Sequence, residues 1–533
     1  MFFSTTKLLK INEMHNFLSI ILINYLGDFQ FRQQVINKLM KNRIFASVSA
    51  LLLTLGINAQ TLFPQNGSMD VCADTHLVLT FEEDAKLSGK GMVRVFDVKS
   101  GECIDSLDLS IPAGPTKPRT YGPECDYTKV PYDYSRTTMP TNKTVKPGTP
   151  SGGAEPTPPE YQLNIIGGFT DAFHFYPIIT KGNVATIYLH NNMLEYGREY
   201  SVNIDSDVFE NYDGIKDWKF TTKTTAPTGT ILTVNADGTA DFCTVQGALD
   251  AIPDFSATPY HINISAGDYE ELVYTRNKKN VRITGAGMNK TKVHYANCEV
   301  FNPHPLTLKT NEYPGTFPSR RAAFMLDNCE DIIMEDICVA TDMRGQAEGL
   351  LVNGERIALR NVHIIGSGDA MQGNGTIYME NCEMDGGGDT FLGRGSIFLY
   401  RCNLRNDGGP FTWVRNTEGH HGDVFVECTF STFNGRKVDF GRVPSNKGKG
   451  YPFAEQVMIN CKTSESIPEG WSSIGEPTAF FAEFNTCDLV TGKPVDTSLR
   501  HKYAHQLDAK KDKKLIRNYT NPAYILNGWT PKF

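Results

Sequence analysis

The chain has 533 residues, which is long enough for two or three domains with a large core. Its formal net charge of -8 at pH 7 argues against nucleic acid and anionic membrane surfaces as main partners. Information about function therefore has to come from local motifs.

Residues 1–59 are predicted to be a leader that ends in a secretory signal over residues 40–59. A basic stretch precedes an apolar run from Ile44 to Ile57, and Asn58-Ala59 offers a cleavage point. No later stretch reads as a membrane span. The pattern predicts a secreted or periplasmic protein.

Residues 60–226 are predicted to be an all-β module, because short β-rich runs alternate with turn residues. Residues 112–159 are rich in Pro, Thr, Gly and Tyr and are expected to form an irregular insertion. The pattern from Phe63-Pro64-Gln65-Asn66-Gly67 through Leu79-Thr80-Phe81 to Phe220-Thr221-Thr222 resembles bacterial Ig-like domains. This resemblance implies an Ig-like β-sandwich ahead of the second domain.

Residues 227–533 carry a repeat of short strand-like runs separated by Gly, Asn and Asp turns. Ile357, Ile377 and Ile397 open successive runs at intervals of twenty residues. A fixed period of this size is typical of a solenoid whose coils share one core. Short β-branched runs without intervening helices favour an all-β fold, a right-handed parallel β-helix, over a leucine-rich horseshoe.

The twelve cysteines would suggest disulfides in an exported protein. Four of them instead close strand-like runs at the same phase, which predicts free thiols stacked inside the solenoid. These four are Cys382, Cys402, Cys428 and Cys461. A disulfide is left open among three others: Cys72, Cys103 and Cys125.

Two glycine-rich turns carry the strongest functional signal. Gly366-Ser367-Gly368-Asp369 and Gly386-Gly387-Gly388-Asp389 place their aspartates twenty residues apart, about one coil of the solenoid. Gln346 lies 23 residues before Asp369, again about one coil. A single Asp in such a turn usually only forms the turn. Two stacked carboxyl groups predict acid/base or nucleophilic chemistry, because repulsion keeps one protonated while the other ionises.

Several stretches between residue 231 and about residue 500 stand out in chain order: Asp237-Gly238-Thr239-Ala240-Asp241-Phe242-Cys243-Thr244-Val245-Gln246, Gly267-Asp268-Tyr269-Glu270-Glu271, Gly345-Gln346-Ala347-Glu348-Gly349-Leu350, Gly366-Ser367-Gly368-Asp369, Gly388-Asp389-Thr390-Phe391-Leu392-Gly393, Phe440-Gly441-Arg442 and Phe481-Ala482-Glu483-Phe484-Asn485. In this order they resemble the motifs of the pectin methylesterase family.

The resemblance implies a role for each matching residue. Asp389 is the expected nucleophile, Asp369 the general acid/base, Gln346 an oxyanion donor and Arg442 the partner that orients Asp389. The chemistry agrees, because a methyl ester needs a nucleophile, an acid for the leaving methoxide and donors for the oxyanion. The expected protein is a monomer that demethylates pectin, or homogalacturonan, without a metal or cofactor.

Two departures from the family pattern bear on the substrate site. Gly368 stands where a second oxyanion glutamine is usual, and such a donor is commonly worth about 2.7–4 kcal/mol. Gln372 is a candidate replacement. Arg442-Val443-Pro444 lacks the sugar-stacking tryptophan of the family. Candidate substrate-binding residues are Trp413, Phe391, Tyr451 and Trp471.

Two other functions stay open from the sequence. A β-helix lyase or hydrolase would need an acidic calcium site or more clustered aspartates, and neither is evident. A noncatalytic glycan-binding protein is compatible with Gly368 and the missing tryptophan. The pair His420-His421 is not expected to share a metal, because adjacent side chains on an extended chain point to opposite sides.

Overall fold

The computed structural model describes residues 61–117, 161–167, 169, 172–303, 319–442, 451–475 and 477–533. The chain divides into two compact units, one of residues 1–58 with 211–213 and one of residues 59–210 with 214–533. The predicted leader, its secretory signal and most of the predicted insertion lie outside the described residues. None of the helices described is long and apolar enough to cross a membrane.

The described part of the N-terminal module is built from strands alone. One sheet has the order β1-β3-β9-β8 and a second has the order β2-β11-β10-β4-β5. Burial alternates along these strands, so that Val93 and Val95 of β4 face the interior. The strand bounds are β1 Thr61–Phe63, β2 Ser68–Val71, β3 Leu77–Thr80, β4 Met92–Asp97, β5 Cys103–Asp108, β6 Leu163–Asn164, β7 Phe173–His174, β8 Ile178–Lys181, β9 Val184–Ile187, β10 Glu199–Ile204 and β11 Ile215–Thr222.

The predicted all-β character of this module is confirmed. Pairing is antiparallel within both sheets except for the parallel pair β2 and β11. The buried indole of Trp218 donates to the carbonyl of Pro64 at 2.9 Å and so ties β11 to the start of the module. The likeness to Ig-like domains stays a prediction.

From residue 231 onward the strands of the described residues form one continuous sheet of 21 strands. They are β12 Ile231–Val234, β13 Tyr260–Ile264, β14 Gly267–Glu270, β15 Val273–Arg276, β16 Lys279–Thr284, β17 Thr291–Tyr295, β18 Ala322–Thr341, β19 Glu348–Ile365, β20 Met371–Glu380, β21 Glu383–Gly386, β22 Phe391–Tyr400, β23 Asn403–Asn406, β24 Thr412–Val414, β25 Gly422–Val426, β26 Thr429–Thr432, β27 Gly441–Arg442, β28 Glu455–Ile459, β29 Lys462–Thr463, β30 Phe480–Phe484, β31 Cys487–Asp488 and β32 Ala504–Gln506.

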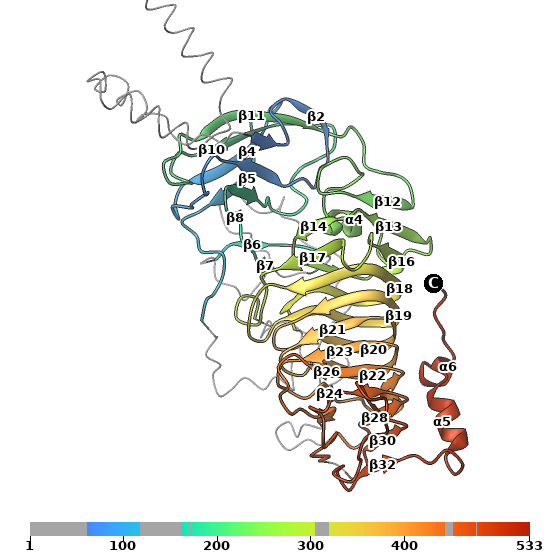
Figure 1. Cartoon of the computed structure of the whole chain (residues 1–533). Helices are drawn as coiled ribbons and strands as arrows, with labels where there is room; N and C mark the ends of the chain where they lie inside the picture. Colours follow the sequence, from blue (N-terminus) through green and yellow to red (C-terminus); the bar gives the residue numbers. More distant parts are fainter. Residues whose placement is uncertain are drawn as a thin grey trace, which may run out of the picture. The chain divides into compact units, whose positions relative to one another are not determined.

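Parallel pairing between successive coils confirms the predicted parallel β-helix. In Figure 1 the coils stack from β18 through β22 to β32, in yellow to red. Ile357 pairs with Ile377, which pairs with Ile397, so the twenty-residue period is one coil. Two helices, α5 Lys513–Tyr519 and α6 Pro522–Ile525, follow the last strand.

The core of the β-helix is a stack of large apolar side chains in register. Phe324, Leu350, Met371 and Phe391 follow one another through four coils and are all fully buried. The expectation that Phe391 contacts substrate is therefore wrong for this structure. The alternation of a strand turns this ring inward, away from any sugar.

One turn of the coil places a residue in the left-handed region at the same position each time. Asn tolerates this conformation better than most residues, which explains its recurrence there. Asn361 donates to Asp336 and Asn485 donates to Asn460, both at 2.9 Å. Side-chain hydrogen bonds therefore link successive coils at these two steps. The positions are Asp336, Asn361, Asn381, Arg401, Glu427, Asn460 and Asn485.

The four cysteines expected inside the solenoid are buried free thiols, as predicted. Backbone hydrogen bonds link them to the next coil: the amide of Asn403 donates to the carbonyl of Cys382, and the amide of Thr429 donates to the carbonyl of Cys402. Cys72 and Cys103 are also free, and Cys125 lies outside the described residues.

The first coil is closed by the short helix α4, Val245–Asp250. Thr244 caps it by accepting from the amide of Gly247 at 2.9 Å. Glu271 accepts from the amides of Val245 and Gln246 at 2.8 and 3.0 Å and so has a structural role at the start of the helix.

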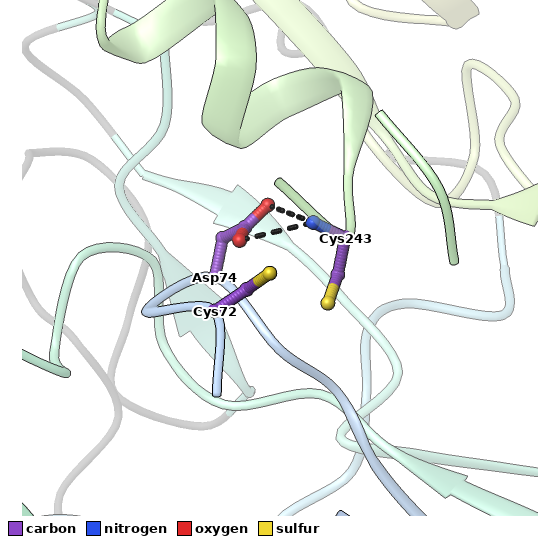
Figure 2. A group of neighbouring side chains, drawn as sticks. All are labelled: Cys72, Asp74 and Cys243. Atoms are coloured by element: carbon purple, nitrogen blue, oxygen red, sulfur yellow. Dashed lines mark hydrogen bonds between the residues drawn. The ribbon is translucent and has the colours of Figure 1, made fainter. Parts of the chain in front are cut away.

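Asp74 of the N-terminal module also binds the start of this helix. Figure 2 shows its carboxylate facing the amide of Cys243, at 3.1 and 3.0 Å to the two oxygens. The same carboxylate accepts from the amide and the hydroxyl of Thr244 at 2.8 and 2.7 Å. These bonds satisfy amides that precede the first helical turn.

We expect Asp74→Ala to lower the free energy of unfolding by about 1–3 kcal/mol, because it strands the amides of Cys243 and Thr244. Chemical denaturation measures this change. Glu83→Ala, at an exposed position of the same module, is the control and should change little. Equal stability of the two variants would contradict the capping role.

Candidate active site

Three carboxyl groups stand at equivalent positions of three successive coils. Glu348, Asp369 and Asp389 each lie two residues before a member of the stacked core column, which is Leu350, Met371 and Phe391. The amide of Gly349 donates to the carbonyl of Ala370, and that of Ala370 to Thr390, which holds the turns in register. The two predicted aspartates are therefore neighbours, with a third acid beside them.

Asp389 is held by Arg442. The Nε of Arg442 donates to Oδ1 of Asp389 at 3.0 Å, and Nη2 donates to Oδ2. Such a two-point contact favours the carboxylate form and fixes its plane. The pairing raises the pKa of Arg442, chiefly through this hydrogen bond. Asp389 is almost fully buried, whereas the Arg442 side chain is half exposed.

Asp369 is held by a different guanidinium, that of Arg321. The Nη2 of Arg321 donates to Oδ2 of Asp369 at 2.9 Å and to Oε1 of Glu348 at 2.7 Å. The Nε of Arg321 also donates to Oε1 of Glu348, at 2.8 Å. One cation is therefore divided between two carboxyl groups on neighbouring coils.

Burial and like charge favour the protonated form of Asp369. Desolvation raises its pKa above the ordinary value, and the nearby Asp389 raises it further, while Arg321 opposes both. Burial also raises the pKa of Glu348, to about 7. The two predicted aspartates thus have unlike surroundings. One arginine binds Asp389 through two nitrogen atoms, whereas Asp369 is desolvated and shares its arginine with a second carboxyl group.

The backbone of Gln346 lies close to that of Gly368, the residue before Asp369. A side chain at Gly368 would bring its Cβ within 3.0 Å of the Gly345 carbonyl oxygen and to 3.2 Å from the Cα of Gln346. Gln346 itself is exposed. The close approach of these backbones gives a physical reason for glycine where a second oxyanion glutamine was expected.

The outer face of the same strands carries a row of residues in register. Gln372 pairs with Leu392, which pairs with Trp413, which pairs with Arg442. The Trp413 ring lies 5.0 Å from the Cζ of Arg442 and 3.8 Å from that of Arg415. Trp413 is therefore beside the cation that holds Asp389.

Two other aromatic candidates differ in their surroundings. Trp471 is fully buried and donates to Gln456 at 2.7 Å, so the expectation that it stacks on sugar is wrong. Tyr451 is partly buried against the core, and its role at the substrate site stays a prediction.

Three residues of the site were not identified from the sequence: Arg321, Glu348 and Arg415. Glu348 lies 21 residues before Asp369, so coil counting alone would have found it. Arg321 and Arg415 lie in less regular stretches. Arg415 is almost fully buried, and desolvation lowers its pKa.

Two groups of potential metal ligands occur within the described residues, both outside this site. One is Cys72, Asp74 and Cys243 (Figure 2), where Asp74 already binds the start of α4 and the ammonium of Lys223 lies 3.2 Å from the Cys72 sulfur. A cation in that place competes with a metal. The other is Glu270, His294 and Asp342, in which Lys181 pairs with Glu270 at 2.9 Å and His294 pairs with Asp342.

Comparison with known proteins identifies the family. The family model described as Pectinesterase matches residues 231–528, more than half of the chain. The chain belongs to the pectinesterase family and is a carboxylic ester hydrolase of that type. The family predicted from the motifs is thereby confirmed.

Individual relatives are distant. A probable pectinesterase 8 of Arabidopsis thaliana is 24% identical over 309 residues, which are 54% of this chain and 74% of that protein. Pectinesterase 3 of Solanum lycopersicum is 32% identical over 136 residues, 25% of this chain and 22% of its own length. A pectin methylesterase from carrot aligns with a TM-score of 0.46 and 19% identity, over 57% of this chain and 95% of that structure.

We expect Gly368→Gln to destabilise the protein and not to restore a second donor. The new Cβ meets the Gly345 carbonyl, and overpacking of this kind typically costs about 1–3 kcal/mol. Thermal unfolding measures the loss. Gly229→Gln is the control, because its Cβ would meet only ordinary contacts at 3.6 Å. A Gly368→Gln protein as stable as wild type would show that the site has room for the family residue.

The raised pKa of Glu348 predicts a pH dependence of stability. The folded value of about 7 lies above the ordinary 4.5, so the folded state binds the extra proton. This contribution is complete below pH 4.5 and is lost as pH rises through 7. We expect the free energy of unfolding of Glu348→Gln, relative to wild type, to increase across this window. The exposed Glu418→Gln control should show a constant difference, and a constant difference for Glu348→Gln would refute the shift.

Proposed function

We propose that the protein hydrolyses methyl esters of galacturonan, with Asp389 as nucleophile and Asp369 as general acid/base. The observation that carries this proposal is the unlike pairing of the two stacked carboxyl groups. Arg442 holds Asp389 from two atoms, whereas burial and like charge raise the pKa of Asp369. Carboxyl groups whose environments differ in this way divide into a nucleophile and an acid.

The acylation step uses both groups at once. The Asp389 carboxylate attacks the ester carbonyl carbon and forms an acyl–enzyme anhydride. The C–O bond to the methoxy group breaks, and Asp369 gives its proton to the departing oxygen, which leaves as methanol. The side chain of Gln346 is the proposed donor to the oxyanion.

Deacylation returns both groups to their starting forms. The Asp369 carboxylate takes a proton from water as the water oxygen attacks the acyl carbon. The anhydride bond breaks, Asp389 leaves as a carboxylate, and the galacturonic acid is released. Arg321 already donates to the carboxyl group of Asp369, which becomes charged in the first step.

Substrate contact is proposed for the row that contains Trp413 and Arg442, with Tyr451 and the buried Arg415 nearby. The half-exposed guanidinium of Arg442 offers a cation to a galacturonate carboxylate. The family supports pectin as substrate, and one pectin methylesterase structure of 18% identity was solved with a hexasaccharide. Export by the predicted signal and a monomeric state belong to the same proposal.

The test is release of methanol and acetate from defined methylated and acetylated pectins. We expect wild type to release methanol, and Asp389→Asn to lose at least about 10³-fold in kcat without loss of folding. Asp407→Asn is the matched control, because Asp407 is an exposed aspartate in the glycine-rich turn of the next coil. Full activity of Asp389→Asn would reject the nucleophile.

The alternative functions have their own readouts in the same samples. Shortening of unmethylated polygalacturonate, assayed with and without a chelator, would indicate a lyase or a hydrolase. Pectin binding without turnover above the Asp389→Asn background would indicate a noncatalytic glycan-binding protein.

A further inference from the structure

Arg321 and Glu348 form a buried ion pair that touches only one of the two stacked aspartates. Arg321 makes three hydrogen bonds, two to Oε1 of Glu348 and one to Oδ2 of Asp369. The Glu348 side chain is fully buried, and that of Arg321 is largely so. A buried charge is retained only with a partner, so the three groups behave as one electrostatic unit.

Glu348 uses its two oxygens unequally. Both donors of Arg321 reach Oε1, while Oε2 is buried and has no hydrogen-bond partner among the residues that the structure describes. A bare carboxylate oxygen in such a place is costly, and a proton on Oε2 removes that charge. Glu348 can therefore exist in two forms at the same position.

Charged groups of both signs surround this unit. Glu299, Glu348 and Asp369 act on Arg321, while Asp389, Arg415 and Arg442 act on Asp369. Glu348 and Asp369, the two acids that divide Arg321, also repel each other. One proton retained by this pair removes that repulsion.

The two forms of Glu348 have opposite effects on Asp369. When Glu348 is ionised, it takes most of the Arg321 charge and repels a second carboxylate, so Asp369 keeps its proton. When Glu348 is neutral, Arg321 is left to Asp369 alone and favours its carboxylate. The first form suits proton donation to methoxide, and the second suits proton removal from water.

We propose that Arg321 and Glu348 are positioning residues that set the protonation of Asp369 during ester hydrolysis. This inference rests on the proposed function of Asp369. Neither residue touches the substrate: Arg321 holds the Asp369 carboxylate, and Glu348 regulates how much of that cation Asp369 receives.

The test is the pH profile of kcat for methanol release. The acid form of Asp369 is required, so kcat falls on the alkaline side as that proton is lost. In Glu348→Gln the undivided Arg321 favours the carboxylate, and the alkaline limb should move to lower pH by about one unit. In Arg321→Met/Glu348→Gln the cation is also gone, and the limb should move back toward higher pH. KM should change by less than about twofold in both.

The control is the exposed Glu418→Gln, whose profile should match wild type. A merely structural role for the pair would lower kcat equally at every pH and leave the limb in place, which would overturn the inference. Opposite movements in the single and double variants support it. The double variant guards against misfolding, because it removes the opposite charges of Arg321 and Glu348 together, and a protonated Asp369 carries no charge.

A second readout separates this inference from the proposed function. Asp369→Asn is made in wild type and in Glu348→Gln, and the free energy of unfolding is followed against pH. The titration of Asp369, seen as the difference between Asp and Asn, should lie at lower pH in the Glu348→Gln background. This holds even if no methanol is released, and an unchanged titration would overturn the inference by itself.

Discussion

Repulsion between carboxyl groups stacked one coil apart is the constraint on which the site depends. Strands of neighbouring coils lie about 4.8 Å apart. Two full charges at that distance repel by about 3–4 kcal/mol at the effective dielectric of a protein surface. Asp369 and Asp389 stand at this spacing and are nearly buried. The spacing of the solenoid therefore favours different protonation states for the two aspartates. The neighbouring arginines determine which of them is ionised.

The arginines reach the site from opposite ends of the stack. Arg442, two coils after Asp389, holds that group with two hydrogen bonds, and Arg321, just before β18, divides itself between Glu348 and Asp369. Neither cation neutralises Asp369 fully. A β-helix can hold this arrangement because its strand register separates the charged groups of successive coils by one strand spacing.

Much of this could be predicted from the sequence, and the reason is the repeat. Ile357, Ile377 and Ile397 gave the coil length, and the coil length placed the two aspartates side by side. The inward orientation of Phe391 could not be predicted without knowing which residue it pairs with on the next coil. A shift of one residue along a strand moves a side chain from the core to the outer face. Glu348 obeys the coil spacing yet was overlooked, and Arg321 follows a stretch without a repeat to count.

The role of Gly368 became clear only from the backbone geometry around it. Its lost side chain looked like a missing donor, whereas the close approach of the Gly345 carbonyl makes glycine a packing requirement. The residue at this position that matters for the chemistry is therefore the adjacent acid, Asp369. Its protonation depends on neighbouring residues of two other coils.

Neutron diffraction from crystals of the protein at mildly acidic pD measures the central claim most directly, because it locates deuterium on carboxyl oxygens. The account predicts deuterium on Asp369 or Glu348, which share Arg321, and none on Asp389, with the two nitrogens of Arg442 facing a bare carboxylate. Deuterium on Asp389, or none on Asp369 and Glu348 at a pD where the protein is folded, would contradict it.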